Sequence, residues 1–457
     1  MTAPVLLWLR QDLRLADQPA LVAACHDGPV IPIYLLDDET PGDHRMGGAS
    51  RWWLHHSLKA LDASLREKGS RLILRRGRAA DVLAALVEET GAARVHAIRH
   101  YEPWWVKAEE RLAGSVELVL HDGNQLAPPG SITTGAGKLF NIYTPFWRAL
   151  SHHMPPDAPM LRPRDIPAPS KWPKSDPLAD WGLLPTKPDW AKGFADWAPG
   201  EAGAHATLDA FRAEAPDYEA TRNLPAEEGT SRLSPHLHFG EVSPRQVWHG
   251  VADAGGSVRT FLGEVGWRDY AQGIIAQFPD YGTANARDTF DKLPWRGGNA
   301  AASDLRAWQR GRTGYPIVDA GMRQLWTTGW MHNRVRMITA SFLIKHLLID
   351  WREGERWFRD CLVDADYGNN SVNWQWTAGT GIDSNMFPRI MAPLVQSVKF
   401  DAAGYIREWV PELAPLSDAA IHDPDAAGCR PEDYPEKIIG HREARERALA
   451  AYRKVRE

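Results

Sequence analysis

Cysteine is scarce in this sequence, and its scarcity excludes several classes of protein. The 457 residues include three cysteines, Cys25, Cys361 and Cys429, which lie far apart without any Cys-x-x-Cys pair. Neither a disulfide framework nor a zinc site is therefore predicted, and we expect no other metal site. A chain without disulfides suits a reducing compartment, so a cytoplasmic protein is expected.

Long hydrophobic runs and a bias of charge are also missing. No apolar run approaches the ~20 residues that span a bilayer, and the first ten residues lack the basic region of a signal peptide. Membrane and secreted proteins are therefore not expected. Lysine and arginine number 53 against 58 aspartate and glutamate, which gives a net charge of −5. A nucleic-acid partner would have to meet a locally positive surface.

The first 130 residues alternate short apolar runs with amphipathic stretches. The runs fall at 5–9, 30–36, 72–74, 95–98 and 116–120, and the stretches include 50–68 and 79–89. This alternation predicts an α/β domain over residues 1–130, a doubly wound parallel sheet with helices on both faces. The first turn contains no glycine, so the G-x-G-x-x-G of a nicotinamide-binding site is absent.

Composition changes after residue 130. Eleven of the 34 prolines fall between 151 and 200, a density that prevents long helices and predicts an irregular interdomain connector over residues 131–200. Beyond it, apolar residues recur at helical spacing in 261–278, 319–330, 332–349 and 353–361. We therefore expect a large all-α domain over residues 201–457, big enough to bury a cofactor.

The segment from Asp364 to Trp376 suits neither a core nor a surface loop. It holds two aspartates, three asparagines and two tryptophans, in a chain with 21 tryptophans. Carboxylates and amides bind the edge of a heteroatom-rich ring, and indoles stack on such a ring or transfer electrons beside it. The segment predicts a pocket for a flat polar ring. The alternative is a polar turn with two chance tryptophans.

Two other segments place polar groups at helices. Residues 229–234, Gly-Thr-Ser-Arg-Leu-Ser, set hydroxyls and an arginine before an apolar helix. This suits phosphate binding, and it also suits plain helix capping. Glu264, Trp267 and Arg268 share one helical face. They either rim a cavity or form an exposed ion pair over a buried indole.

A mixed face also occurs within residues 329–337. Trp330, Asn333, Arg334 and Met337 lie three and four positions apart, so they share one side of a helix. A core helix would exclude the amide and the guanidinium, and a solvated face would exclude the indole and the thioether. The mixture predicts a binding face, whereas His332 alone is more typical of a structural histidine.

Taken together, these segments resemble the DNA photolyase/cryptochrome family, and most of all its cyclobutane pyrimidine dimer photolyases. The resemblance runs from residue 5 to about residue 412 and is weakest in the connector. It rests on ordered motifs at 8–21, 229–234, 264–268, 308–320, 329–337, 350–355 and 364–376. The resemblance implies that the helical domain binds FAD.

The resemblance also implies a role for each matching residue. FAD would be bound by Tyr218, Thr230, Ser231, Arg232, Leu233 and Ser234 at the diphosphate, Arg268 and Asn333 along the flavin, Asp364 and Asp366 at the ring and ribityl side, and Asn370 beside flavin N5. A photoreduction chain would run through Trp374, Trp351 and Trp295, for which three core tryptophans are the alternative. DNA and the lesion would contact Glu264, Trp267, Asn333, Arg334, Met337, Trp376 and Arg389. Glu264 and Asn370 would be catalytic.

The implied function is light-driven repair of cyclobutane pyrimidine dimers in UV-damaged DNA, by electron transfer from excited reduced FAD in a carbon–carbon lyase. A monomer is expected. The alternative is a cryptochrome-like blue-light photoreceptor that signals through a partner. The joint presence of Glu264, Trp267, Met337 and Trp376 favours repair.

Two features of the resemblance stay open. A second, antenna chromophore is expected, a folate or a deazaflavin. Residues 43–56 and 99–105 could bound it in the sheet domain, or could be plain packing. Residues 386–393 depart from the usual family pattern, which leaves the choice between duplex and single-stranded DNA open.

Overall fold

The apolar runs of the N-terminal region form one parallel sheet in the computed structural model, which describes residues 3–114, 116–385 and 387–456. The strand order is β3-β2-β1-β4-β5. Every residue of the first two strands is buried, as expected where both faces of a parallel sheet are covered. The strands are β1 (Val5–Leu9), β2 (Val30–Leu36), β3 (Ile73–Arg76), β4 (Arg94–Ile98) and β5 (Glu117–His121).

Helices cover both faces of this sheet. Leu7 and Leu9 pack in one apolar cluster with α1 and α2, while Leu6 and Trp8 pack in another with α3 and α4. Successive side chains of β1 thus point into apolar cores on opposite faces of the sheet, which confirms the predicted doubly wound α/β fold. The helices of this region are α1 (Pro19–Asp27), η1 (Gly42–His44), α2 (Gly48–Glu67), α3 (Ala79–Thr90) and α4 (Pro103–Leu112).

The proline-rich residues 152–200, all of them described, are irregular apart from η2 (Leu178–Trp181) and η3 (Ala191–Phe194). They follow α5 (Tyr143–Ser151). The segment is fastened by its indoles: Trp181 is buried, and Trp197 Nε1 donates to the Thr328 carbonyl at 2.8 Å. The domain boundaries at residues 130 and 200 stay predictions.

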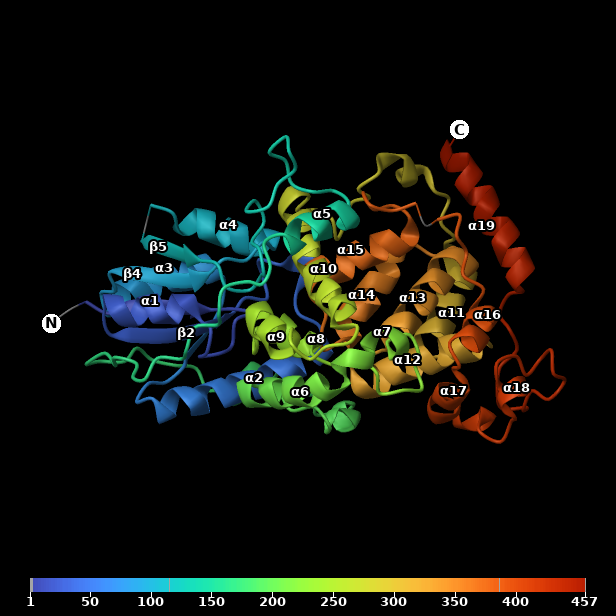
Figure 1. Cartoon of the computed structure of the whole chain (residues 1–457), viewed down its shortest axis with the longest axis horizontal. Coiled ribbons are helices and arrows are strands. Elements are labelled where there is room, and N and C mark those ends of the chain that lie inside the picture. Colours follow the sequence, from blue (N-terminus) through green and yellow to red (C-terminus); the bar gives the residue numbers. More distant parts are fainter. Residues whose placement is uncertain (1–2, 115, 386, 457) are drawn as a thin grey trace.

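The remaining chain is helical, which confirms the predicted all-α region. Figure 1 shows the sheet at one end of the molecule and these helices forming the other. The predicted stretch 332–349 is α13 followed by a π-helical turn, η6, because its last residues take the wider i→i+5 bonding. In the part of the chain that the structure describes, no helix combines the length and apolar character that a bilayer crossing requires. The elements are α6 (Glu201–Glu214), η4 (Ala215–Asp217), α7 (Tyr218–Thr221), α8 (Ser234–His238), α9 (Pro244–Val251), α10 (Val258–Gln277), η5 (Asp288–Lys292), α11 (Gly298–Gln309), α12 (Pro316–Thr328), α13 (Asn333–Ser341), η6 (Phe342–His346), α14 (Trp351–Cys361), α15 (Tyr367–Ala378), α16 (Pro393–Lys399), α17 (Ala403–Trp409), η7 (Pro411–Leu413), α18 (Asp418–Ile421) and α19 (His441–Arg456).

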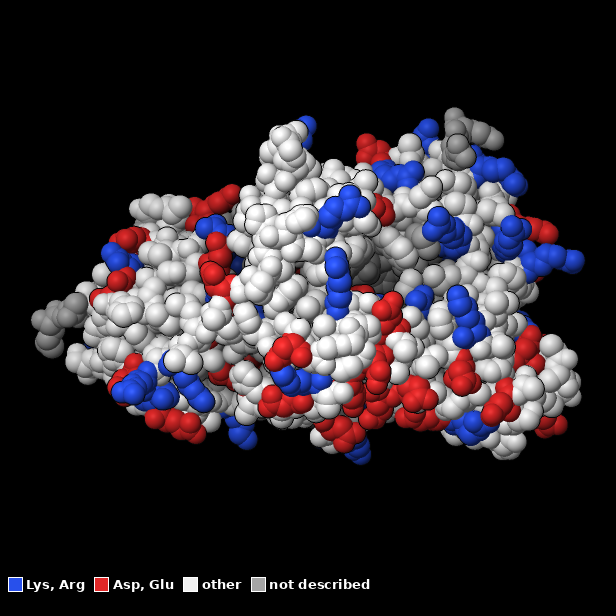
Figure 2. Space-filling model, in the orientation of Figure 1, with Lys and Arg blue, Asp and Glu red and all other residues white. Residues whose placement is uncertain are grey.

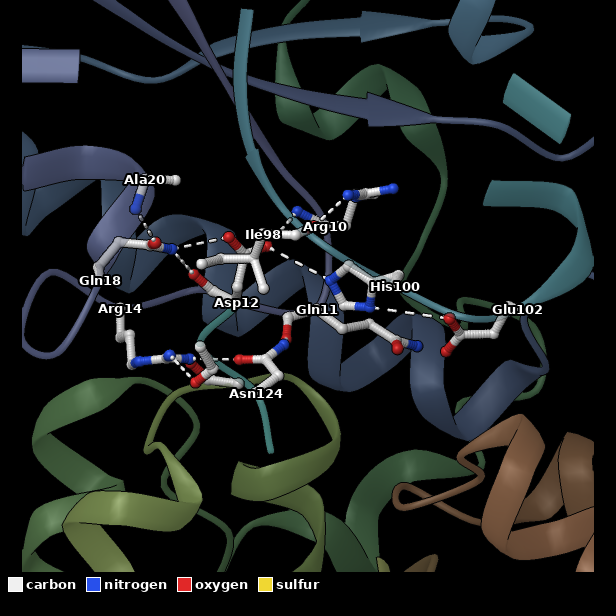
Figure 3. A network of polar contacts seen from close by, with 12 residues as sticks. Arg10, Gln11, Asp12, Arg14, Gln18, Ala20, Ile98, His100, Glu102 and Asn124 are labelled. Carbon is white, nitrogen blue, oxygen red and sulfur yellow. Dashed lines mark hydrogen bonds and ion pairs between the residues drawn. The ribbon is translucent and has the colours of Figure 1, made fainter. Parts of the chain in front are cut away.

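A buried polar network joins the sheet to the helical region (Figure 3). It lies beyond the carboxyl ends of β1 and β4, the place where open α/β sheets commonly bind ligands. Arg14 donates to the Asn124 side chain and to the Gly240 carbonyl, both at 2.9 Å. Asp12 accepts from Gln18 at 2.7 Å and is fully buried. The network fills the space beyond β1 and β4 with the chain's own side chains.

Candidate functional site

The helical region contains a large cavity between its two apolar cores. One wall comes from α7, α8 and α10, and the other comes from α13, α14 and α15. Counted to its open mouth, the cavity has a volume of about 2080 Å³. Figure 2 shows a hollow in this face of the molecule with lysine and arginine side chains on several sides of it.

Most residues singled out from the sequence line this cavity. Their roles stay predictions, but the structure brings them together from segments more than 150 positions apart. Those in the lining are Tyr218, Thr230, Ser231, Arg232, Ser234, Glu264, Trp267, Arg268, Asn333, Arg334, Met337, Asp364, Asp366, Asn370, Trp374 and Trp376.

The segment before α8 presents its hydroxyls and arginine to the cavity. Arg232 has a φ of +51°, a left-handed backbone conformation, and its guanidinium lies over the rings of Trp197 at 4.7 Å and Trp330 at 5.1 Å. Burial lowers the pKa of Arg232. Leu233 is different, because its side chain is buried in the apolar core and does not belong to the cavity lining.

A carboxylate cluster forms one side of the cavity where α15 begins. Asp364 accepts from Ser234 Oγ at 2.6 Å and from both terminal nitrogens of Arg336, at 3.0 and 2.8 Å. Asp366 caps α15 by accepting from the Asn369 backbone N–H at 2.7 Å. Both carboxylates are held by neighbours before any ligand arrives, which is the arrangement that preorganised binding requires.

Asn370 lies one turn into α15 and is oriented by a second carboxylate. Its amide nitrogen donates to Glu355 Oε1 at 2.9 Å, and Glu355 pairs with Arg359 at 3.1 Å. Burial raises the pKa of Glu355, and the charge of Arg359 opposes that shift. With its nitrogen committed to Glu355, the Asn370 carbonyl group is left to face the cavity ligand.

The rim of the cavity carries an acid, an indole and two arginines. Glu264 pairs with Arg222 at 2.5 Å, and the Glu264 side chain is 43% exposed whereas that of Arg222 is 16% exposed. Trp267 packs against the Tyr143 ring at 4.7 Å. Arg334 donates to Asn223 Oδ1 at 2.7 and 3.1 Å. These charges sit at the mouth, where a polyanion would first meet the protein.

The three predicted redox tryptophans differ in burial and in whether they line the cavity. Trp374 lines the cavity and packs edge-on against Trp308, with ring centroids 6.4 Å apart. Trp351 lies outside the cavity lining, fully buried, and its Nε1 donates to Asn285 at 2.9 Å. Trp295 is partly buried against the same apolar core. The chain through these residues stays a prediction.

Arg389 also lies outside the cavity lining. Its side chain is exposed on the loop between α15 and α16. Within the unusual stretch 386–393, Met386 is outside the described residues, and Pro388 is exposed like Arg389.

Sequence reasoning missed Arg222, Arg336, Tyr143 and His238, all of which line the cavity. The periodicity of 329–337 points to the face of Asn333 and Met337. Arg336 joins the cavity lining because it pairs with Asp364, which lies in the turn between α14 and α15. Arg222 carried a weak signal, since it lies one helical turn from the predicted Tyr218.

A smaller cavity, of about 710 Å³ when counted to its open mouth, lies between the sheet and the helices. Its lining includes residues of both stretches considered for a second pigment: His44, Met46, Gly47 and Ser50 from one, Trp104 and Trp105 from the other. His44 stacks on Trp104 with ring centroids 6.2 Å apart, and burial lowers the pKa of His44 to about 4. His238 and Asn370 line both cavities, so the two spaces are neighbours.

Comparison with known proteins agrees with this geometry. Residues 5–168 match the model of the DNA photolyase family, and residues 261–454 match that of the FAD binding domain of DNA photolyase. A deoxyribodipyrimidine photo-lyase of Agrobacterium fabrum is 48% identical, over 100% of this chain and 99% of its own.

Two solved structures have the same fold over nearly their whole length. A bacterial class III photolyase from Agrobacterium tumefaciens, 47% identical, covers 100% of this chain and 98% of its own with a TM-score of 0.93. An archaeal photolyase from Sulfolobus tokodaii with two FAD molecules is 29% identical, covers 98% and 99%, and has a TM-score of 0.84. On sequence and structure alike, this chain is an enzyme of the DNA photolyase family, with that family's FAD-binding domain.

Proposed function

We propose that this protein repairs cyclobutane pyrimidine dimers in DNA in a light-driven reaction, with FAD held in the large cavity. The observation that carries the proposal is the layout of that cavity. A carboxylate and amide cluster, Asp364, Asp366 and Asn370, lies within, and Glu264 and Trp267 stand at the mouth. One space can therefore hold a cofactor and admit a lesion beside it.

The residues of the cavity fit FAD. The hydroxyls of Thr230 and Ser231 are donors for a diphosphate, and Arg232 adds positive charge. The Ser234 hydroxyl instead orients Asp364. Asp364 and Asp366 are acceptors for hydroxyl and ring N–H groups. The cavity is open at its mouth and lined by apolar and aromatic side chains with a few convergent polar groups, which is the usual form of a cofactor site.

The mouth suits an extruded pair of pyrimidines. Extrusion from a duplex costs a few kcal/mol, least for damaged bases that stack poorly. Stacking on Trp267 and Trp376 would offset part of this cost, at about 1–3 kcal/mol per base. Arg222 and Arg334 would face the backbone phosphates. Glu264 would accept a hydrogen bond from a base edge.

When bound, FAD in its light-excited reduced form supplies the electron that splits the dimer. The protein's own residues position the flavin and the lesion and shield them from water. Asn370, oriented by Glu355, would hold the flavin edge, and the buried Trp374 and Trp351 would conduct electrons to the cavity during photoreduction. Arg336 holds the Asp364 carboxylate in place through their ion pair.

A second chromophore in the smaller cavity would gather light for the first. The supporting observations are its aromatic lining by Tyr34, Trp104 and Trp105 and its shared wall with the large cavity. The Sulfolobus photolyase holds two FAD molecules, with a novel light-harvesting cofactor implied. A folate and a deazaflavin both remain candidates here, and the absorption spectrum of the purified protein distinguishes them. We place the enzyme in the cytoplasm, as a monomer.

Blue-light repair of a UV-irradiated thymine oligonucleotide tests the function directly. The reduced protein, with its flavin content measured, is expected to restore base absorbance under light and not in darkness. A protein that carries reduced FAD and restores nothing would contradict the proposal. That outcome would favour a cryptochrome-like photoreceptor or another lesion.

A further inference from the structure

A lysine is buried beneath the loop that carries Arg389. Lys345 lies in the π-helical turn η6, directly after α13, which supplies Asn333, Arg334 and Met337 to the cavity. Its side chain is 0% exposed. Fully buried lysines are rare, and a single π turn within a helix frequently marks a functional site.

Lys345 makes a specific contact with this loop. Its Nζ donates to the backbone carbonyl of Arg389 at 3.0 Å. Burial lowers the pKa of Lys345 to about 7, but the ammonium and the neutral amine can both donate to a carbonyl. The bond therefore persists in either protonation state.

Other contacts hold the same loop further upstream. Arg287 donates to the carbonyls of Gly379 at 3.1 Å and Ser384 at 2.6 Å. Phe387 is buried against the rings of Phe290 and Tyr452. The bond from Lys345 lies beyond these contacts, at the residue whose side chain is exposed.

The loop connects α15 to α16 and lies beside the cavity. α15 supplies Trp374 and Trp376 to the lining. Within the loop, Asp383 accepts a hydrogen bond from the backbone N–H of the cavity residue Tyr143 at 2.9 Å. The loop is thus tied to the cavity from two sides, and Arg389 projects from it.

Stability alone does not account for this lysine. Removing an amine from water is costly, and an apolar side chain of similar volume commonly packs in such a place at no loss of stability. The bond to the Arg389 carbonyl does, however, fix the backbone from which the Arg389 side chain projects. An arginine on a fixed backbone loses less freedom when it meets a phosphate than one on a mobile loop.

We propose that Lys345 is a positioning residue for DNA binding, which holds the backbone at Arg389 so that the Arg389 guanidinium meets a phosphate beside the cavity. The role rests on the proposed function, since it needs DNA at the mouth. In this role the buried Lys345 contributes to DNA binding without touching DNA, through the surface residue Arg389.

The test measures binding of a UV-irradiated duplex oligonucleotide across a range of salt concentrations. Lys345→Met should raise the Kd by about tenfold and reduce the slope of log Kd against log salt by about 1, the contribution of one phosphate contact. Arg389→Gln should do the same. The double variant should bind no more weakly than either single variant, because both remove one contact.

Three controls separate positioning from general damage. Lys345→Arg keeps a donor under the loop and should recover the parent slope, also if Lys345→Met proves too unstable to purify. Lys437→Met removes a lysine from a partly exposed pair with Asp423 and should leave the slope unchanged. Flavin content should match the parent in every variant, because Lys345 lies outside the cavity lining.

The outcomes also distinguish this proposal from the function on which it rests. A parent that fails to bind irradiated DNA would refute the proposed function, and this role with it. A parent that binds, with an unchanged slope in Lys345→Met or with losses that multiply in the double variant, would refute the role of Lys345 alone.

Discussion

The polar network beyond β1 and β4 and the helical cavity both gather polar side chains, but only the network is closed. In the network, Asp12, Arg14 and Gln18 are 0% exposed and bond to one another or to backbone. At the cavity mouth, the Glu264 side chain is 43% exposed. Open α/β sheets commonly bind ligands at the carboxyl ends of their strands, but here the space beyond β1 and β4 docks the two regions, and the proposed binding sites lie in the neighbouring cavities.

The largest effect is expected from opening the closed network. Arg14 donates to the carbonyls of Asp17 and Gly123 as well as to Asn124 and Gly240. Arg14→Met leaves these buried acceptors unpaired and should lower the free energy of unfolding by about 3–5 kcal/mol. Urea unfolding measures the loss.

Arg212→Met is the matched control for this experiment. Arg212 pairs with Asp253 at 2.8 Å, and both side chains are largely exposed, so about 0–1 kcal/mol is expected. Equal losses in the two variants would mean that the polar network does not dock the two regions.

A second effect of the closed network should appear in the dependence of stability on pH. Burial, and after it the charge of Asp366, raises the pKa of Glu102 from 4.5 to about 7. Between these pH values the unfolded chain releases this proton and the folded chain keeps it. The parent should therefore lose about 3 kcal/mol of stability as pH rises through this window.

Glu102→Gln cannot ionise, so the variant should escape this loss. Its advantage in free energy of unfolding should grow from about pH 4.5 to about pH 7 and then level off. Urea unfolding of both proteins at matched pH values measures the advantage. An advantage that stays constant with pH would mean that Glu102 ionises in the folded protein much as it does in the unfolded chain.

The same contrast explains how far sequence reasoning reached. The apolar runs at 5–9 and 30–36 predict β1 and β2 at their observed bounds, because a strand buried on both faces is apolar throughout. Helical spacing likewise places Glu264, Trp267 and Arg268 together at the cavity. Local periodicity thus predicts which face of a strand or helix is buried.

Periodicity does not predict which distant segment packs against that buried face. Arg336 meets Asp364 from 28 positions away, and Arg14 meets Gly240 from 226 away. Neither pair has a local signature, since long-range pairs depend on how the helices dock. For the same reason no spacing foretold that Trp308 would lie against Trp374. The residue types of the site could be predicted from the sequence, but the contacts between those residues could not.

The open site should respond in activity rather than in stability. Glu264→Gln removes the charge of the exposed partner of the pair with Arg222 and keeps an amide oxygen as an acceptor, so the cost to the fold should be about 1 kcal/mol. If Glu264 bonds to the flipped lesion, light-driven repair should fall about tenfold, equivalent to about 1.4 kcal/mol. Flavin content should stay at the parent level. Glu214→Gln, at an exposed position on α6, serves as the control.

A loss of FAD in Glu264→Gln would mean that Glu264 supports the cofactor site and does not act on the substrate. The contrast between a structural network and a functional cavity would then fail at this residue. Unchanged repair with unchanged flavin would instead remove Glu264 from the lesion contacts. Each result locates the boundary between the two parts of the cavity differently.

The smallest effect should come from Arg334, because its contact with DNA would be one of several. Its guanidinium is already held by Asn223 and by the Phe400 ring, so Arg334→Ala removes a positioned charge. The salt dependence of binding to irradiated DNA should weaken by about 1 in slope, with a Kd several-fold higher at low salt. Arg310→Ala, an exposed arginine at the end of α11, should change neither. If both variants weakened the slope equally, binding would follow the net charge of the protein, and the mouth of the cavity would have no privileged part in it.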